Sequence, residues 1–592
     1  MSPEFLPSLV DINPGFAVIL AGILAYFIRI PVLRAIITIG GPVIGLLMLS
    51  TFSEFGVDHG VMRVMDLTAI TYRVDSLSFI FALAFLIAAA INSIYSLHNK
   101  DPLQDACALI YAGAAIAASL CGDLMTVFFF WELTAVSSVF LIWQTGTKAA
   151  YKAGMRYIAI QILSGVLLLF GAVYFLGNHG DLSLRAISLE EDGAWLIFLG
   201  FGIKAAFPFL HNWLQDSYPK ATPTGAVVLS AFTTKLAVYM FARMFPGEHI
   251  LIYIGAVMTI FPVFFAVVEN DLRKVLAYSL NNQVGFMICA IGVANLDTEY
   301  GRYALNGAAA HAFAHIMYKG LLFMSMGAVL HRTGTTKASE LGGLWRTMPW
   351  TTVFCLIGAA SISAFPLFSG FVAKSMTLSA IGHEGYVIVW CMLLFASAGV
   401  LEHSGIKIPY FAFFGHDSGK RPKEAPFNML VAMGCSAFIC IAVGIPGLGG
   451  TKWLYSQLPY ATEALYYLEH SLWTWDHVVT QFQLLILAML AFVLMQRFGL
   501  YPAEKPGVVL DFDWTYRRIG YGFAHWADRL WERASPAMTN GWRKLGSRVH
   551  TYLTEAFSPE GMLSKGGPSG SMAVWTALIL GLVIAVSVVS AI

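Results

Sequence analysis

The chain has 592 residues, of which 57% are hydrophobic and 12% charged, with a formal net charge of +1. This composition is typical of a protein that crosses a membrane many times, and the balanced charge excludes the basic face that nucleic-acid binding requires. None of the seven cysteines forms a CxxC pair, so a disulfide framework, an iron–sulfur cluster and a structural zinc site lack support. We expect an all-α polytopic membrane protein with no cofactor and no metal.

Hydropathy predicts sixteen membrane-spanning helices. They cover residues 13–29, 31–50, 75–96, 104–120, 122–144, 154–176, 194–214, 224–245, 249–268, 271–293, 303–330, 350–377, 385–413, 427–446, 481–498 and 572–591. Fifteen lysines and arginines lie in loops that follow the odd-numbered spans through span 13, and six lie in loops that follow even-numbered spans. Because cytoplasmic loops carry the basic excess, we expect the N-terminus outside and a location in the bacterial inner membrane.

Charged side chains lie inside the fifth, seventh and eighth predicted spans. Glu132 lies between aromatic and small hydroxyl residues, Lys204 is in the seventh span and Lys235 is in the eighth. A charge at the bilayer midplane costs ~2.5–3.5 kcal/mol unless it faces a partner or water. A static buried ion pair contributes little to stability, whereas a buried amine is suited to proton transfer. We interpret the three residues as proton-relay groups, with a static ion pair as the alternative.

The same tripeptide, Ala-Phe-Pro, occurs at 206–208 in the seventh span and at 364–366 in the twelfth. A proline inside a helix removes a backbone hydrogen bond, and membranes tolerate such a break where it is buried or lines a wet cavity. Lys204 lies just before the first tripeptide and Lys374 follows the second. Because spans five apart cross in opposite directions, the two matched breaks indicate a transporter built from inverted repeats.

The eleventh span, residues 303–330, carries His311, His315 and Lys319 at four-residue steps. This spacing places them in one stripe on one helix face, and the small residues 307–310 let a neighbouring helix approach closely. The stripe predicts a segment of a proton relay. The alternatives are ordinary interhelical hydrogen bonds and a metal site built from the two histidines, for which the span has no cysteine or carboxylate ligand.

The C-terminal part of the chain has a different pattern. Glu402, His403 and Lys407 fit either the exit of a relay or snorkelling side chains at the membrane boundary. Residues 514–556 form an amphipathic stripe rich in tryptophan and arginine, interrupted near Pro536. We expect two helices that lie flat in the cytoplasmic interface before the final span. A hairpin that binds a soluble partner is the alternative.

Five segments together resemble the antiporter-like membrane subunits shared by complex I and Mrp-type cation/proton antiporters. They are FFFWELTAVSSVFLIW, GFGIKAAFPFLHNWLQDSYPKATPTGAVVLSAFTTKLAVYMFAR, NDLRKVLAYSLNNQVGFM, AHAFAHIMYKGLLF and ISAFPLFSGFVAKS. The resemblance covers residues 75–415 and is greatest to the D subunit of Mrp-type antiporters. The chain departs from the family pattern at Gln215, where the family usually has proline, and in a connector shorter than the lateral helix of the longest complex I subunit.

The resemblance implies two inverted five-helix repeats around a hydrophilic axis at the membrane midplane. It also implies that seven side chains carry protons along this axis: Glu132, Lys204, Lys235, His311, His315, Lys319 and Lys374. We therefore divide the chain into helices 1–3 (1–103), a first repeat (104–246), a second repeat (247–414), helices 14–15 (415–499), an amphipathic segment (500–571) and a final helix (572–592).

We expect a proton-translocating subunit of a multisubunit Na⁺/H⁺ antiporter, whose partners are the lipid bilayer, sister subunits, H⁺ and Na⁺. No redox chemistry is expected on this chain. Three alternatives remain open. The first is a proton-pumping subunit of a redox-driven NADH:quinone oxidoreductase or hydrogenase-type complex. The second is a proton-driven subunit for inorganic-carbon uptake, and the third is a membrane scaffold with inert buried charges.

Overall fold

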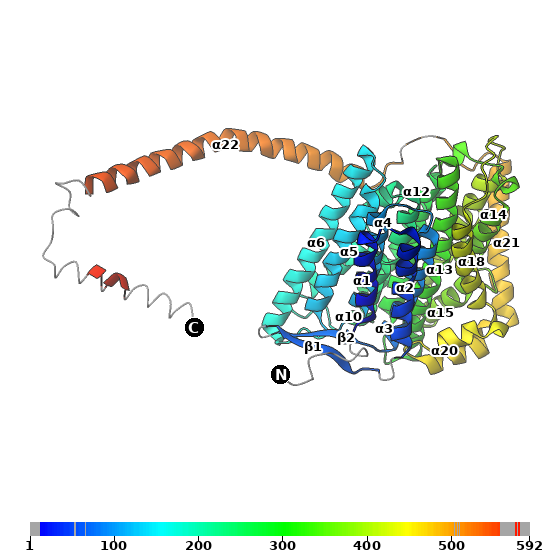
Figure 1. Ribbon diagram of the computed structural model, residues 1–592. Coiled ribbons are helices and arrows are strands. Elements are labelled where there is room, and N and C mark those ends of the chain that lie inside the picture. The colour runs from blue at the N-terminus through cyan, green and yellow to red at the C-terminus, as the bar shows by residue number, and fades with distance from the viewer. Residues whose placement is uncertain are drawn as a thin grey trace. The chain divides into compact units, whose positions relative to one another are not determined.

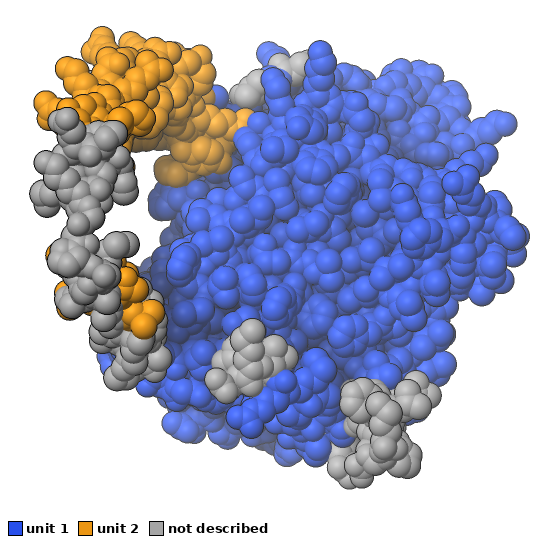
Figure 2. Space-filling view, turned by 60° about the vertical axis from the view of Figure 1, so that its left-hand side comes forward, with its two compact units in different colours: residues 1–511 blue, residues 512–592 orange. Residues whose placement is uncertain are grey.

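The computed structural model describes residues 12–51, 55–64, 67–502, 504–505, 507, 509–556, 575–576 and 578–580. The chain divides into two compact units, residues 1–511 and residues 512–592, coloured separately in Figure 2. Unit 1 is a bundle of helices that run between two faces, with one β-hairpin on one of the faces (Figure 1). This arrangement confirms the predicted all-α polytopic class.

The first half of unit 1 contains the hairpin and the helices before the centre of the chain. They are α1 (Pro14–Phe27), α2 (Pro31–Ser50), β1 (Asp58–Val64), β2 (Leu67–Arg73), α3 (Ser76–Ser96), α4 (Pro102–Ser119), α5 (Leu124–Trp143), α6 (Lys148–His179), α7 (Ala194–Ala205), α8 (Asn212–Ser217), α9 (Pro223–Ala231), α10 (Thr233–Met244), α11 (Ile250–Val268) and α12 (Leu272–Val293).

The second half of unit 1 begins with the longest helix of the bundle. It contains α13 (Glu299–Thr333), α14 (Pro349–Ile362), α15 (Ser369–His383), α16 (Val387–Val400), the π-helical turn η6 (Leu401–Ile406), α17 (Lys407–Pro409), α18 (Phe427–Ala442), α19 (Gly450–Tyr455), α20 (Ala461–Tyr467) and α21 (Trp475–Arg497). Unit 2 contains α22 (Asp513–Ala556).

Polar caps start many of these helices. The side chain of Asp75 accepts a hydrogen bond from the backbone of Ser78, whose side chain accepts one from Asp75 in return. Asp123 caps α5 and its carboxylate also accepts the backbone N–H of Ile70, which ties the hairpin to the bundle. Such caps satisfy N–H groups that have no partner within the helix. They fix where each apolar segment enters the bundle.

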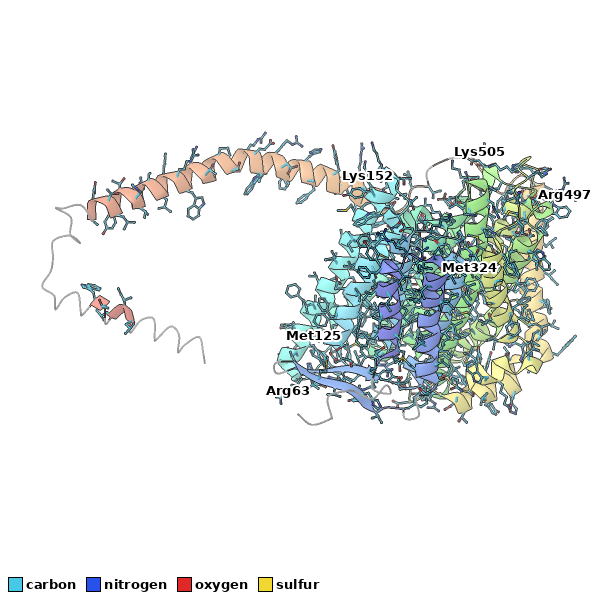
Figure 3. All side chains as sticks on the ribbon, viewed as in Figure 1. Arg63, Met125, Lys152, Met324, Arg497 and Lys505 are labelled. Carbon is cyan, nitrogen blue, oxygen red and sulfur yellow. The ribbon has the colours of Figure 1, made fainter. Side chains whose placement is uncertain are left out.

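The two faces of unit 1 differ in charge and structure. The antiparallel hairpin β1–β2, with Val61 opposite Ile70, lies on one face, which we call the hairpin face. Figure 3 shows Arg63 on this face, and Lys152, Arg497 and Lys505 on the opposite one, which we call the basic face. The relay residues lie on the helices between the two faces.

The two Ala-Phe-Pro tripeptides break their helices in the same way. After α7, Ala206 has φ 62° and Phe209 has φ 69°; after α14, Ala364 has φ 58° and Leu367 has φ 73°. In each break the phenylalanine N–H bonds a carbonyl five residues back, at 3.0 Å for Phe207 and 3.1 Å for Phe365. The breaks predicted in the seventh and twelfth spans, which follow α7 and α14, are therefore confirmed, and the two have similar backbone geometry.

The first fifteen predicted spans each contain a helix, and in the described part of the chain ten helices are long and apolar enough to cross a membrane. The sixteenth span lies largely outside the described residues. The count of sixteen, the inverted repeats and the six-part division of the chain stay predictions. One expectation is wrong. Helix α22 runs through Pro536 without interruption, because a single exposed proline removes one helix hydrogen bond and water satisfies the freed carbonyl.

Candidate functional site

Glu132 lies on α5 against a glycine of the neighbouring helix. A Cβ at Gly165 of α6 would overlap the Oε1 of Glu132, so only glycine leaves room for this carboxylate. Oε1 is buried and has no hydrogen-bond partner among the described residues. The charge of Lys204 acts on Glu132 electrostatically, but these two described side chains make no direct ion pair. The predicted interaction between Glu132 and Lys204 is therefore electrostatic and involves no direct contact.

The ammonium of Lys204 is held by α5 itself. Its Nζ donates to the carbonyl of Trp131 at 2.6 Å and to Oγ1 of Thr134 at 2.8 Å. It also lies 4.2 Å from the Trp131 ring centroid, in a cation–π contact. Lys204 is fully buried at the last turn of α7, just before the break. The ammonium is thus solvated by neutral groups of α5 that lie one residue before and two residues after Glu132 in the sequence.

Lys235 lies at the start of α10, directly after a second irregularity. Helices α9 and α10 are interrupted at Phe232, whose φ of −105° and ψ of −64° depart from the helical values. This leaves the carbonyl of Ser230 to accept a hydrogen bond from Lys235 Nζ at 2.6 Å. Lys235 is fully buried. Its charge acts on His311, His315 and Lys319 of α13.

His311 belongs to a three-membered hydrogen-bond ring with residues from two helices. Its Nε2 lies 2.9 Å from the hydroxyl of Tyr318 and 3.3 Å from Oε1 of Gln283 on α12, and Tyr318 donates to the same oxygen at 3.0 Å. His311 Nδ1 has no hydrogen-bond partner among the described residues. One ring nitrogen is therefore fixed, and the other is open to a mobile partner.

His315 and Lys319 are the least satisfied groups of the predicted set. Both are fully buried, and within the described chain neither nitrogen of His315 nor Nζ of Lys319 has a hydrogen-bond partner. The rings of His311 and His315 are 6.2 Å apart. Buried polar atoms are almost always bonded to protein or to internal water. Within the predicted stripe, His311 makes an interhelical hydrogen bond to Gln283, whereas His315 and Lys319 make none to the described residues.

Lys374 lies on α15, beyond the second break. Its Nζ donates to the carbonyl of Ile362 at the end of α14, at 2.7 Å, and lies 5.2 Å from the ring centroid of Phe286. Phe286 in turn packs against His311. The charge of Lys374 acts on His311, His315 and Lys319. The structure therefore brings Lys235, His311, His315, Lys319 and Lys374 into one cluster and Glu132 with Lys204 into another.

The polar set continues beyond Lys374 toward the basic face. His403 bonds Ser404 at 2.9 Å, and Ser404 donates to Ser279 of α12 at 2.7 Å. The charges of Lys319 and Lys407 both act on His403. Lys407 is fully buried and donates to the carbonyl of Val267 at 2.6 Å. Whether Glu402, His403 and Lys407 form the exit of a relay or lie at the membrane boundary stays a prediction.

Sequence reasoning missed the amide side chains that surround these groups. Gln283 bonds His311, and Asn281 Nδ2 donates at 3.0 Å to the carbonyl of Ala206 in the first break. Gln481 Nε2 donates at 3.0 Å to the carbonyl of Ala364 in the second break. The run Leu-Asn-Asn-Gln at 280–283, inside an otherwise apolar span, was the available signal. Gln215, where the family pattern has proline, lies within helix α8.

No group of three or more His, Cys, Asp or Glu side chains among the described residues is arranged to hold a metal ion. The site therefore consists of amines, imidazoles, hydroxyls and a carboxylate. Amines, imidazoles and carboxylates bind and release protons.

Comparisons with known proteins agree with this geometry. Residues 121–401 match the family described as NADH:quinone oxidoreductase/Mrp antiporter, transmembrane. Hydrogenase-4 component B of Escherichia coli is 27% identical over 437 residues, which is 67% of this chain and 64% of that protein. The D subunit of the Na(+)/H(+) antiporter of Alkalihalophilus pseudofirmus is 32% identical over 319 residues, 50% of this chain and 63% of that protein. This chain spans less than two thirds of the length of either relative.

Two solved structures share the fold. A chain of the Mrp complex from Dietzia sp. DQ12-45-1b has a TM-score of 0.66 at 20% identity, covering 80% of this chain and 99% of that chain. A chain of the membrane-bound sulfane sulfur reductase, an archaeal respiratory membrane complex, has a TM-score of 0.67 at 21% identity, covering 97% and 99%. The greater similarity to the D subunit of Mrp-type antiporters stays a prediction. The family match over residues 121–401, the relatives and the shared fold show that this chain is similar to the antiporter-like membrane subunits common to complex I and Mrp-type cation/proton antiporters.

Proposed function

We propose that this chain translocates protons as one subunit of a multisubunit Na⁺/H⁺ antiporter. The observation that carries the proposal is the state of His315 and Lys319, which are fully buried and whose side-chain nitrogens have no hydrogen-bond partner among the described residues. A static structural role would favour satisfied groups. Groups that exchange protons need mobile partners, and internal water supplies them.

In this proposal a proton moves from Glu132 by way of Lys204 and Lys235 to the α13 stripe, and then to Lys374. Lys204 alternates between its position on the Trp131 carbonyl and a position closer to Glu132. When Lys204 approaches Glu132, the field at Lys235 falls, so the charge state of one cluster biases the other. Proton movement inward would drive Na⁺ outward, with sister subunits contributing to the Na⁺ path. The basic face would be cytoplasmic and the N-terminus outside.

The test is cation-dependent proton movement in inverted vesicles that contain the assembled complex. Glu132→Gln and Lys204→Ala should each lower the rate at least tenfold. The first removes the titrating carboxyl, and the second removes the amine that interacts with it. Glu190→Gln changes an exposed carboxylate on the hairpin face and should leave the rate unchanged. Full transport by both relay variants, with assembly intact, would refute the relay.

A second candidate is a proton-pumping subunit of a redox-driven complex. Its support is the similarity to hydrogenase-4 component B, which extends over more of this chain than the similarity to the antiporter's D subunit. The proteins that remain bound after gentle detergent extraction separate the two candidates. Partners that carry iron–sulfur clusters or other redox centres would favour the redox-driven complex, and partners that are all membrane subunits without such centres would favour the antiporter.

A further inference from the structure

The segment after α21 brings two acidic side chains back into the bundle. We call its described residues, 498–502, 504–505, 507 and 509–511, the post-α21 segment. Glu504 and Asp511 are only 7% and 5% exposed, although both lie in a loop at the surface of unit 1. Lys505, between them, is exposed on the basic face (Figure 3). Each carboxylate therefore lies at the boundary between that face and the interior.

Asp511 lies at the first broken helix. Its Oδ2 is 3.1 Å from Nε2 of His211, the residue that ends the break between α7 and α8, and accepts a hydrogen bond from Tyr278 of α12 at 2.8 Å. His211 Nδ1 is buried and has no hydrogen-bond partner among the described residues. One ring nitrogen of His211 thus faces a surface carboxylate, and the other is open toward the interior.

Tyr278 connects this site to the break itself. Asn281, three residues later on α12 and therefore on the same helix face, holds the carbonyl of Ala206. Lys274 lies over the other end of the Tyr278 ring, 5.9 Å from its centroid. Among the titratable groups near Asp511 are therefore His211 and Tyr278, which contact it, and Lys274, which lies over the Tyr278 ring.

Glu504 lies at the corresponding place in the second half. Its Oε1 is 2.8 Å from Nζ of Lys407, which is fully buried and leads through His403 to Lys319. Burial raises the pKa of Glu504, and the charge of Lys407 opposes this shift. The other groups near this pair are Glu402, Glu269 and Tyr501, together with Lys274, which bonds Glu269 at 2.7 Å.

We propose that Glu504 and Asp511 are the proton-access residues of the two halves, through which protons pass between the basic face and the relay. This inference rests on the proposed proton-relay function. At the first site, a proton on Asp511 passes to Nε2 of His211, and His211 releases its Nδ1 proton inward, so that the ring returns to neutrality. At the second site, Glu504 exchanges a proton with Lys407. Because one segment carries both carboxylates, its position couples access to the two halves.

The test measures the initial rate of proton movement in inverted vesicles, in H₂O and in D₂O. Asp511→Asn keeps the shape of the side chain and one acceptor oxygen but cannot carry a proton, and Glu504→Gln does the same at the second site. Each should lower the rate at least fivefold and increase the solvent isotope effect, because proton access becomes rate-limiting. Asp511→Glu and Glu504→Asp should recover most of the rate. Lys505→Gln, in the same segment, should match the parent protein.

Three results would overturn the proposal. Asp511→Asn and Glu504→Gln could transport at the rate of Lys505→Gln, they could lose rate without a change in isotope effect, or they could fail to assemble. The second and third results would show that the two carboxylates hold the segment in place and do not carry protons. Glu132→Gln, measured alongside, separates the two proposals. If it is inactive while the segment variants are normal, the relay stands and only the access role fails; if it is fully active, the relay itself fails.

Discussion

Four buried lysines of the described helices donate to backbone carbonyls: Lys204, Lys235, Lys374 and Lys407, the last of which also pairs with the Glu504 carboxylate. An ammonium without an acidic partner is costly at bilayer depth, and carbonyls left free at helix ends and breaks carry partial negative charge. Three of these lysines use a carbonyl at such an end or break. Lys235 bonds Ser230 at the α9–α10 interruption, Lys374 bonds Ile362 at the end of α14, and Lys407 bonds Val267 near the end of α11. Irregular backbone thus provides neutral partners that an ammonium can leave.

The position of the Glu132 carboxylate depends on Gly165, a residue without a side chain. Gly165→Ala should place a methyl group where Oε1 of Glu132 lies and displace the carboxylate from its position on α5. We expect proton movement to fall at least threefold in inverted vesicles, while the amount of assembled complex stays near that of the parent protein. Gly177→Ala is the matched control, because a Cβ at this position of the same helix meets no atom within 4 Å. Equal rates for the two variants would show that the position of the carboxylate does not matter.

At the scale of elements, the two broken helices are the repeated feature of the bundle. Each places a non-glycine residue in the left-handed region at the alanine of the tripeptide, a conformation that costs ~1–2 kcal/mol for an L-residue. Each freed alanine carbonyl accepts an amide hydrogen bond from another helix, from Asn281 on α12 or Gln481 on α21. The sequence predicted the breaks from proline but not these partners, since they lie 75 and 117 residues away along the chain.

Glycine substitutions at Ala205 and Ala206, on either side of the C-terminal end of α7, should have opposite effects on the unfolding temperature. Ala206→Gly relieves the strain at φ 62° and should raise the unfolding temperature of the detergent-solubilised complex. Ala205→Gly lies at the last helical residue of α7 and should lower it, because glycine destabilises a helix by ~0.5–1 kcal/mol relative to alanine. Ala364→Gly should behave like Ala206→Gly. A drop in unfolding temperature for both Ala206→Gly and Ala364→Gly would contradict the assigned backbone geometry.

At the scale of the whole molecule, the sequence predicted the parts better than their connections. Hydropathy located fifteen helices, and four-residue spacing placed His311, His315 and Lys319 on one face, because both signals are periodic and local. The role of Gly165 beside Glu132 and the return of Asp511 to His211 could not be predicted. Both depend on contacts between segments far apart in the chain, and the post-α21 segment has no periodic pattern. The uninterrupted α22 was missed because proline was given too much weight in an exposed helix.

The proposed relay requires that protons cross between the two clusters through the centre of the bundle. Lys319 is the best residue for testing this requirement. It is fully buried on α13, and its Nζ makes no hydrogen bond to any described residue. Methionine has a similar length and no charge, so Lys319→Met removes the titrating group without removing a described hydrogen bond. Methionine is also apolar and suits a buried position, so the substitution should not lower the stability of the fold.

The most direct measurement is therefore cation-dependent proton movement by the assembled Lys319→Met complex in inverted vesicles, with its unfolding temperature recorded on the same preparation. Lys152→Met, at an exposed position on the basic face, is the control. The relay predicts that Lys319→Met lowers proton movement at least tenfold without lowering the unfolding temperature, while Lys152→Met changes neither. Proton movement at the parent rate in a stable Lys319→Met complex would contradict a relay through α13.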